Sequence, residues 1–70
     1  MYTTQAPASL GMTTSDYHVT AAEYHENAAE SHRSAAAHLD YGNHQEANKQ
    51  AQLAKECGRL AIQNCEMAMK

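Results

Sequence analysis

Histidine and cysteine are the residues of this sequence whose types could support chemistry. Seven of them are spread over the 70 residues: His18, His25, His32, His38, His44, Cys57 and Cys65. Imidazole and thiolate groups are the usual protein ligands of zinc and copper. A single helix holds a metal between side chains three or four residues apart, and no two of the histidines have that spacing. The sequence therefore predicts no metal site within one helix.

A metal site assembled across helices is the alternative. His18, His25 and His32 recur every seven residues, so they would share one face of a helix at intervals of about 10 Å. Two antiparallel helices would bring Cys65 near His18 and Cys57 near His25. We expect the cysteines to be small packing residues and the histidines to lie at the boundary with solvent, with no cofactor bound. Zinc or copper binding by His18, His25, His32 and Cys65 is the possibility that these residues leave open.

Catalysis is not expected from this composition. A reactive thiolate needs a helix N-terminus or a neighbouring cation and an accessible pocket, whereas Cys65 comes late in the second predicted helix. An enzyme also needs a scaffold that holds several groups rigidly around a pocket. The chain has no Trp or Phe, and nearly half of its apolar residues are alanines. We therefore expect the protein not to be an enzyme.

The charge and hydropathy patterns argue against two classes of partner. Eight acidic side chains outweigh five basic ones, and no basic run exists, so a nucleic-acid partner is not expected. No stretch holds the roughly 20 apolar residues that a membrane span needs, so no membrane partner is expected. The uncharged first residues do not resemble a secretory signal, and two cysteines are too few for a disulfide scaffold. A cytoplasmic protein is the expectation that follows.

The first half of the chain predicts an arm followed by a long helix. Residues 1–14 contain a proline and a glycine without charge or periodicity, and we expect a flexible N-terminal arm there. Helix-compatible sequence runs from about 15 to 41, with Ser15 or Asp16 as its cap, or Thr20 with Glu23 as a capping box one turn later. Within it the heptads TAAEYHE, NAAESHR and SAAAHLD follow one another. A sustained heptad repeat is typical of a helix that packs along another helix.

A glycine turn and a second helix complete the predicted fold. Gly42 suits the left-handed residue that commonly ends a helix, so we expect a turn at 41–43 and a second helix from about 44 to 69. Small residues at spacings of three, four or seven favour close packing of the two helices. The predicted seam consists of Ala21, Ala28, Ala35, Ala47, Ala51, Ala54, Gly58, Ala61 and Cys65. The fold class predicted for residues 15–70 is therefore all-α, an antiparallel two-helix hairpin with an alanine-rich seam.

Larger apolar side chains are predicted to lie beside this seam. The predicted interface with another molecule consists of Tyr17, Tyr24, Leu39, Leu53, Cys57, Leu60 and Met67. Together with the seam, these side chains form an apolar arc around the second helix that is wider than one partner helix covers. We expect a homo-oligomer, either a dimer that forms a four-helix bundle or a tetramer, and hence a non-catalytic structural or interaction module. An unknown protein partner on the same surface is the competing possibility.

Two stretches, AAEYHENAAESHRSAAAHLDYGNHQEA and ANKQAQLAKECGRLAIQNCEMA, resemble a group of short bacterial proteins of unknown function. In that group the first helix repeats Ala-Ala-x-His-His, a glycine turn follows, and the second helix is rich in Ala and His. The resemblance covers about two-thirds of the chain and implies a helical hairpin with no assigned activity. Tyr24, Ser31 and Leu39 stand where the group has a second histidine, so no metal role is carried over. A looser similarity of LDYGNHQEA to a single tetratricopeptide-like hairpin implies the hairpin geometry alone.

Overall fold

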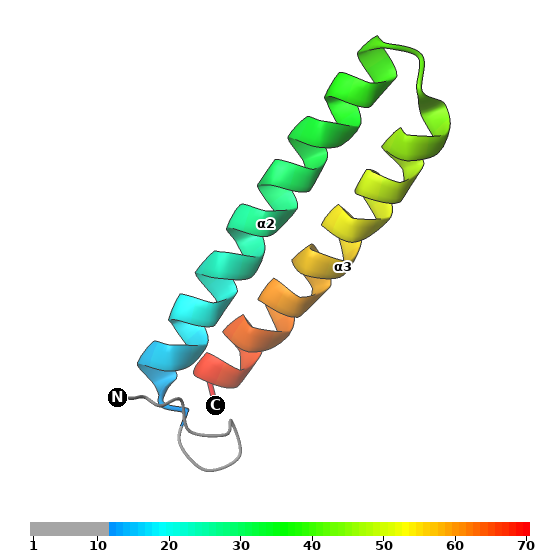
Figure 1. The fold of residues 1–70 in the computed structure, drawn as a ribbon. Coiled ribbons are helices and arrows are strands. Elements are labelled where there is room, and N and C mark those ends of the chain that lie inside the picture. The colour runs from blue at the N-terminus through cyan, green and yellow to red at the C-terminus, as the bar shows by residue number, and fades with distance from the viewer. Residues whose placement is uncertain (1–11) are drawn as a thin grey trace.

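Two long antiparallel helices make up the fold. The computed structural model describes residues 12–70, in which helix α2 spans Thr14–Asp40 and helix α3 spans His44–Ala68. The two helices lie side by side along their whole length and are joined by a short turn at one end (Figure 1). The predicted all-α hairpin is confirmed, whereas the expected arm at 1–14 lies mostly outside the described residues.

Helix α2 begins with a capping box that differs from the expected cap. Thr13 is the N-cap, and its Oγ1 accepts a hydrogen bond of 3.1 Å from the backbone N–H of Asp16. The Asp16 carboxylate accepts a bond of 3.0 Å from the backbone N–H of Thr13 in return. Asp16 therefore occupies the third helical position, where its charge also complements the positive end of the helix dipole. The expected caps at Ser15, Asp16 or Thr20 were wrong, because Thr13 and Asp16 together satisfy two terminal N–H groups.

The turn ends α2 and starts α3 within three residues. Gly42 adopts a left-handed backbone with φ of 76°, and its N–H donates to the carbonyl of Leu39. The N–H of Asn43 donates to the carbonyl of His38, which completes the hydrogen-bond pattern of a Schellman motif. The Asn43 side chain then accepts a bond of 3.3 Å from the backbone N–H of Glu46 and caps α3. One residue thus closes the first helix and opens the second.

Alanine supplies every buried side chain of the described residues. Ala47, Ala54, Ala61 and Ala68 of α3 are buried at intervals of seven, and Ala61 has no exposed surface. On α2 the buried residues are Ala21 and Ala35, with Ala28 half-buried between them. A methyl group is all that projects from each of these positions, so the helix axes can approach closely. The core therefore fixes the pairing of the helices but encloses no large side chain.

One part of the expected seam was wrong. Ala51 is exposed, and Gly58 and Cys65 are half-buried, whereas Gln50, Cys57 and Asn64 are half-buried on the other flank of the alanine row. A Cβ atom added to Gly58 would meet nothing within 4 Å, so no close approach occurs there. On the flank of Gln50 the larger side chains of Cys57 and Leu60 are half-buried as well, and their partial burial removes more apolar surface from water than burial of Ala51 would. Asn64 tolerates this position because its side-chain Nδ2 donates a bond of 2.8 Å to the Leu60 carbonyl.

Replacing each of the two glycines of the hairpin by alanine should have opposite effects on the free energy of unfolding. Gly42→Ala forces a Cβ into the left-handed region and should lower the free energy of unfolding by about 1–2 kcal/mol. Gly58→Ala fills open space within a helix and should raise it by about 1 kcal/mol. Chemical denaturation followed by circular dichroism measures both changes. A destabilising Gly58→Ala would show that another chain occupies the space beside Gly58.

Candidate interaction surface

The candidate metal ligands do not converge among the described residues. His18, His25 and His32 are exposed along α2, and Cys65 is half-buried in α3. Within residues 12–70 no three side chains of His, Cys, Asp or Glu are placed to hold a metal ion together. Both cysteine thiols are free. The cross-helix alternative therefore finds no three-ligand site in a single copy of residues 12–70.

Large apolar side chains lie on the outside of the hairpin. Leu53 is 53% exposed and Met67 40% exposed, and Leu60 between them is half-buried. These three residues, which we call the apolar stripe, recur every seven residues and so share one flank of α3 with Cys57. Ile62 and Met69, also exposed, lie on the opposite flank of α3. Helix α2 covers the alanine row between these flanks and leaves both flanks open.

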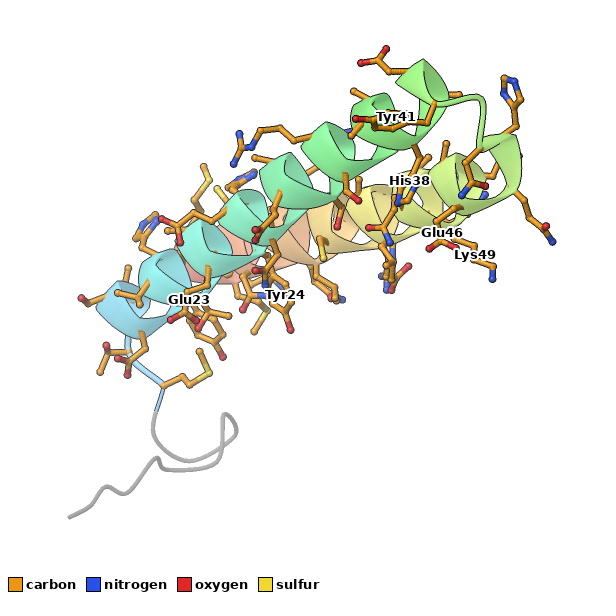
Figure 2. The ribbon with its side chains drawn as sticks, turned by 45° about the horizontal axis from the view of Figure 1, so that its top comes forward. Glu23, Tyr24, His38, Tyr41, Glu46 and Lys49 are labelled. Atoms are coloured by element: carbon orange, nitrogen blue, oxygen red, sulfur yellow. The ribbon has the colours of Figure 1, made fainter. Side chains whose placement is uncertain are left out.

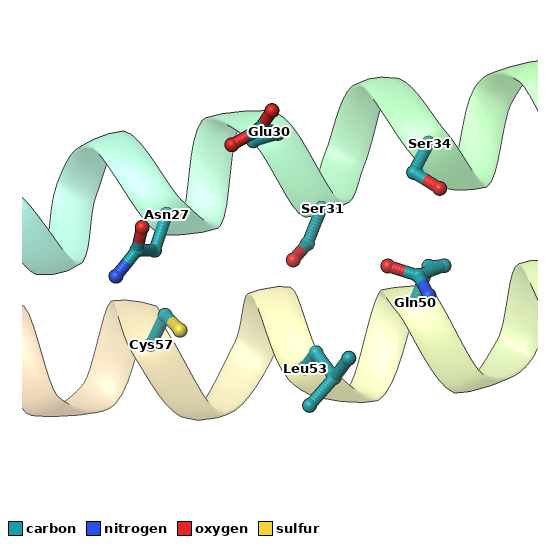
Figure 3. Close-up of a pocket in the computed structure, with 7 residues that line it drawn as sticks. All are labelled: Asn27, Glu30, Ser31, Ser34, Gln50, Leu53 and Cys57. Atoms are coloured by element: carbon teal, nitrogen blue, oxygen red, sulfur yellow. The ribbon is translucent and has the colours of Figure 1, made fainter.

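Beside the apolar stripe the structure contains an open groove. Its volume is about 470 Å³, and it runs between the two helices (Figure 3). The lining residues are Asn27, Glu30, Ser31 and Ser34 of α2 and Gln50, Leu53 and Cys57 of α3. Short polar side chains on α2 therefore face a large apolar one on α3. The groove is a hollow on the surface with two titratable groups, Glu30 and Cys57, at its wall.

The predicted interface residues are distributed over this side of the hairpin and its ends. Tyr17, Tyr24, Cys57 and Leu60 are half-buried, and Leu53 and Met67 are exposed. Figure 2 shows Tyr24 beside Glu23 on α2, while Tyr41 lies near the far end of the same helix, close to the turn. Leu39 is exposed near the turn and does not line the groove.

Sequence reasoning missed the polar wall of the groove. Asn27, Ser31 and Ser34 follow one another at spacings of four and three, the same spacing that identifies an apolar helix face. Because these side chains are polar, the periodicity of large apolar residues that predicts an interface does not include them. A search for small residues of any polarity would have found Ser31 and Ser34.

The two helices differ in charge. Helix α2 carries five acidic side chains against Arg33 alone, a net charge of −4, whereas three acidic and three basic side chains balance in α3. Within α3, the Nζ atom of Lys49 lies 4.0 Å from the Oε1 atom of Glu46 (Figure 2). Arg59 forms a hydrogen-bonded ion pair with Glu56. The hydrogen bond and the positive charge of Arg59 lower the pKa of the Glu56 carboxyl group. Lys49 and Arg59 have their partners on α3 itself, and within residues 12–70 no ion pair joins α3 to α2, so the acidic side chains of α2 form an uncompensated negative surface.

Comparisons with protein-family models, with curated proteins and with solved structures found no match to this chain. The resemblance to short Ala- and His-repeat proteins therefore stays a prediction. Neither α2 nor α3 has both the length and the apolar character that crossing a membrane requires.

Metal addition provides a direct test of the dispersed histidines. One equivalent of Zn²⁺ or Cu²⁺ should leave the melting temperature of the chelator-treated protein unchanged within about 1 °C, because no three ligands converge in one copy. Thermal melts followed by circular dichroism measure this. A rise of several degrees that Cys65→Ser or His18→Ala abolishes would contradict it.

Proposed function

We propose that the protein is a non-catalytic interaction module that associates with a second copy of itself, two hairpins forming a four-helix bundle. The observation that carries this proposal is the inverted distribution of its apolar residues. Within residues 12–70 the buried side chains are all alanines, and Leu53, Ile62 and Met67 are exposed. A reducing compartment such as the cytoplasm suits the two free thiols.

The stability of a lone hairpin supports self-association. Ordering some fifty residues costs roughly 1.5 kcal/mol each, and this cost must be offset by burial of apolar surface. Each fully buried leucine or methionine contributes about 1.5–3 kcal/mol, far more than a methyl group. The hairpin leaves most of this contribution unused, since Leu53 and Met67 are exposed and Leu60 is only half-buried. A second hairpin packed on that side would cover the stripe.

The size of the groove side also suits a second copy. Helix α3 has 25 residues and is therefore about 38 Å long. Two adjacent helices are about 20 Å wide, so the side measures roughly 750 Å². Stable interfaces of standard size bury about 600–1,000 Å² on each partner. A two-fold dimer through this side is therefore large enough to persist without another partner.

Solution mass tests the proposal. Light scattering on the reduced protein over a hundredfold dilution should give a constant mass of a whole multiple of 7.7 kDa, with a dimer as the smallest. Leu53→Asp places a charge on the groove side and should shift the mass to 7.7 kDa or unfold the chain.

The matched control is Ile62→Asp, on the opposite flank of α3, which should keep the mass of the unaltered protein. A monomer of 7.7 kDa at every concentration of the unaltered chain would overturn self-association. It would leave the groove side free for a different protein.

The two thiols offer an independent readout. Cys57 lines the groove, whereas Cys65 lies on the other flank of the alanine row. Alkylation of Cys57 should therefore slow by about tenfold or more as protein concentration rises through the association range, because only the free hairpin exposes it. Alkylation of Cys65 should change little. Equal slowing of both thiols, measured by mass spectrometry, would contradict the assigned side.

A further inference from the structure

The groove has the geometry of a hole that can receive a side chain from another helix. Its α2 wall consists of Asn27, Glu30, Ser31 and Ser34, which are positions i, i+3, i+4 and i+7 of one helix (Figure 3). Four residues at this spacing form the hole that receives one side chain, the knob, of a facing helix in knobs-into-holes packing. Leu53 of the same chain borders this hole and stays 53% exposed. The hairpin alone therefore leaves the hole open.

We propose that the occupant is the apolar stripe of a second copy of this chain, so that each α2 packs antiparallel on the partner's α3. The inference rests on the self-association proposed above and adds its arrangement. Two other observations support it, the level of Leu53 along the hairpin and the charge of α2.

The level of Leu53, meaning its position along the helix axes, determines which residues of α2 the Leu53 of a symmetric partner would meet. Leu53 and Ser31 line the same groove, so they lie at one level along the two antiparallel helices. Rotation about a two-fold axis parallel to the helices keeps each residue at its level along that axis and brings the partner's α3 over α2. The partner's Leu53 therefore arrives at the level of the hole around Ser31.

The heptad repeat extends this match along the hairpin. Leu60 and Met67 follow Leu53 at intervals of seven. On α2 a shift by the same seven residues gives a second hole at positions 20, 23, 24 and 27, and a further shift gives a third at 13, 16, 17 and 20. Tyr24 and Tyr17, both half-buried, stand in these holes where Ser31 stands in the first. The partner's Leu53 thus meets the open hole at Ser31, whereas its Leu60 and Met67 meet the rings of Tyr24 and Tyr17, which occupy the second and third holes.

Charge disfavours the other symmetric arrangement. A two-fold axis across the helices would stack α2 on the partner's α2. Asp16, Glu23 and Glu30 recur every seven residues on the groove flank of α2, so two acidic rows would face each other. Helix α3 has no net charge, so packing α2 on the partner's α3 avoids this repulsion.

Disulfide trapping distinguishes the arrangements. In a background that carries Cys57→Ser and Cys65→Ser, Ser31→Cys and Leu53→Cys are made in separate proteins, mixed and oxidised. Because random exchange makes half of the dimers mixed, about half of the chains should enter a mixed disulfide between positions 31 and 53. Leu60→Cys alone should give almost no disulfide dimer, because the two α3 helices lie diagonally across the bundle.

Each other outcome overturns a defined part of the inference. Efficient Leu60→Cys dimers without the mixed disulfide would show that α3 packs on the partner's α3 and would leave self-association intact. A doubled mass with neither disulfide would assign the interface to another side. A monomeric mass for the unaltered chain would overturn the self-association itself and leave the hole for a helix of a different protein.

A second variant tests the hole without any cysteine. Ser31→Phe fills the hole from within and should raise the dissociation constant at least tenfold, while the matched control Ala36→Phe, exposed on the opposite flank of α2, should keep the mass of the unaltered protein. Retained helicity at high concentration shows that Ser31→Phe still folds. An unchanged dissociation constant for a folded Ser31→Phe would overturn the proposed occupant.

Discussion

Close packing of alanine on alanine is the constraint on which the rest of this structure depends. A row of methyl groups at positions 47, 54, 61 and 68 lets α3 approach α2 along its whole length. The same closeness leaves no room for a leucine, a methionine or a tyrosine between the helices. Every large apolar side chain of residues 12–70 is therefore at most half-buried. The outward position of the apolar stripe is a direct consequence of the small core.

The turn imposes a second constraint, on the direction of the chain. Asn43 donates its backbone N–H to the end of α2 and accepts from the start of α3 with its side chain. These two bonds, with the left-handed Gly42, leave few conformations for the connection. The relative levels of the two helices, and hence the pairing of Leu53 with Ser31 at the groove, follow from this short connection.

The sequence predicts the two helices and their order, but not which flank of the alanine row on α3 is the more covered. Gly42 and the regular alanines predict two helices, their order and most of the buried row, because each signal is local. The choice between Ala51 and Gln50 as neighbours of α2 depends on how Cys57 and Leu60 pack, which spacing alone does not reveal. Likewise Thr13 was missed as a cap because its contribution depends on the reciprocal bond with Asp16. The groove was missed because its α2 wall is polar, although its spacing is that of an apolar face.

Regular burial at intervals of seven also limits how such a protein can change in length. Inserting a single residue into either helix rotates all later positions by about 100° and turns the alanine row away from its partner. Adding seven residues to one helix alone keeps the row but leaves one end unpaired. A hairpin of this kind can therefore grow or shrink only by whole heptads, in both helices together. The number of heptads, and with it the number of knobs that a second chain could offer, is a discrete property of the sequence.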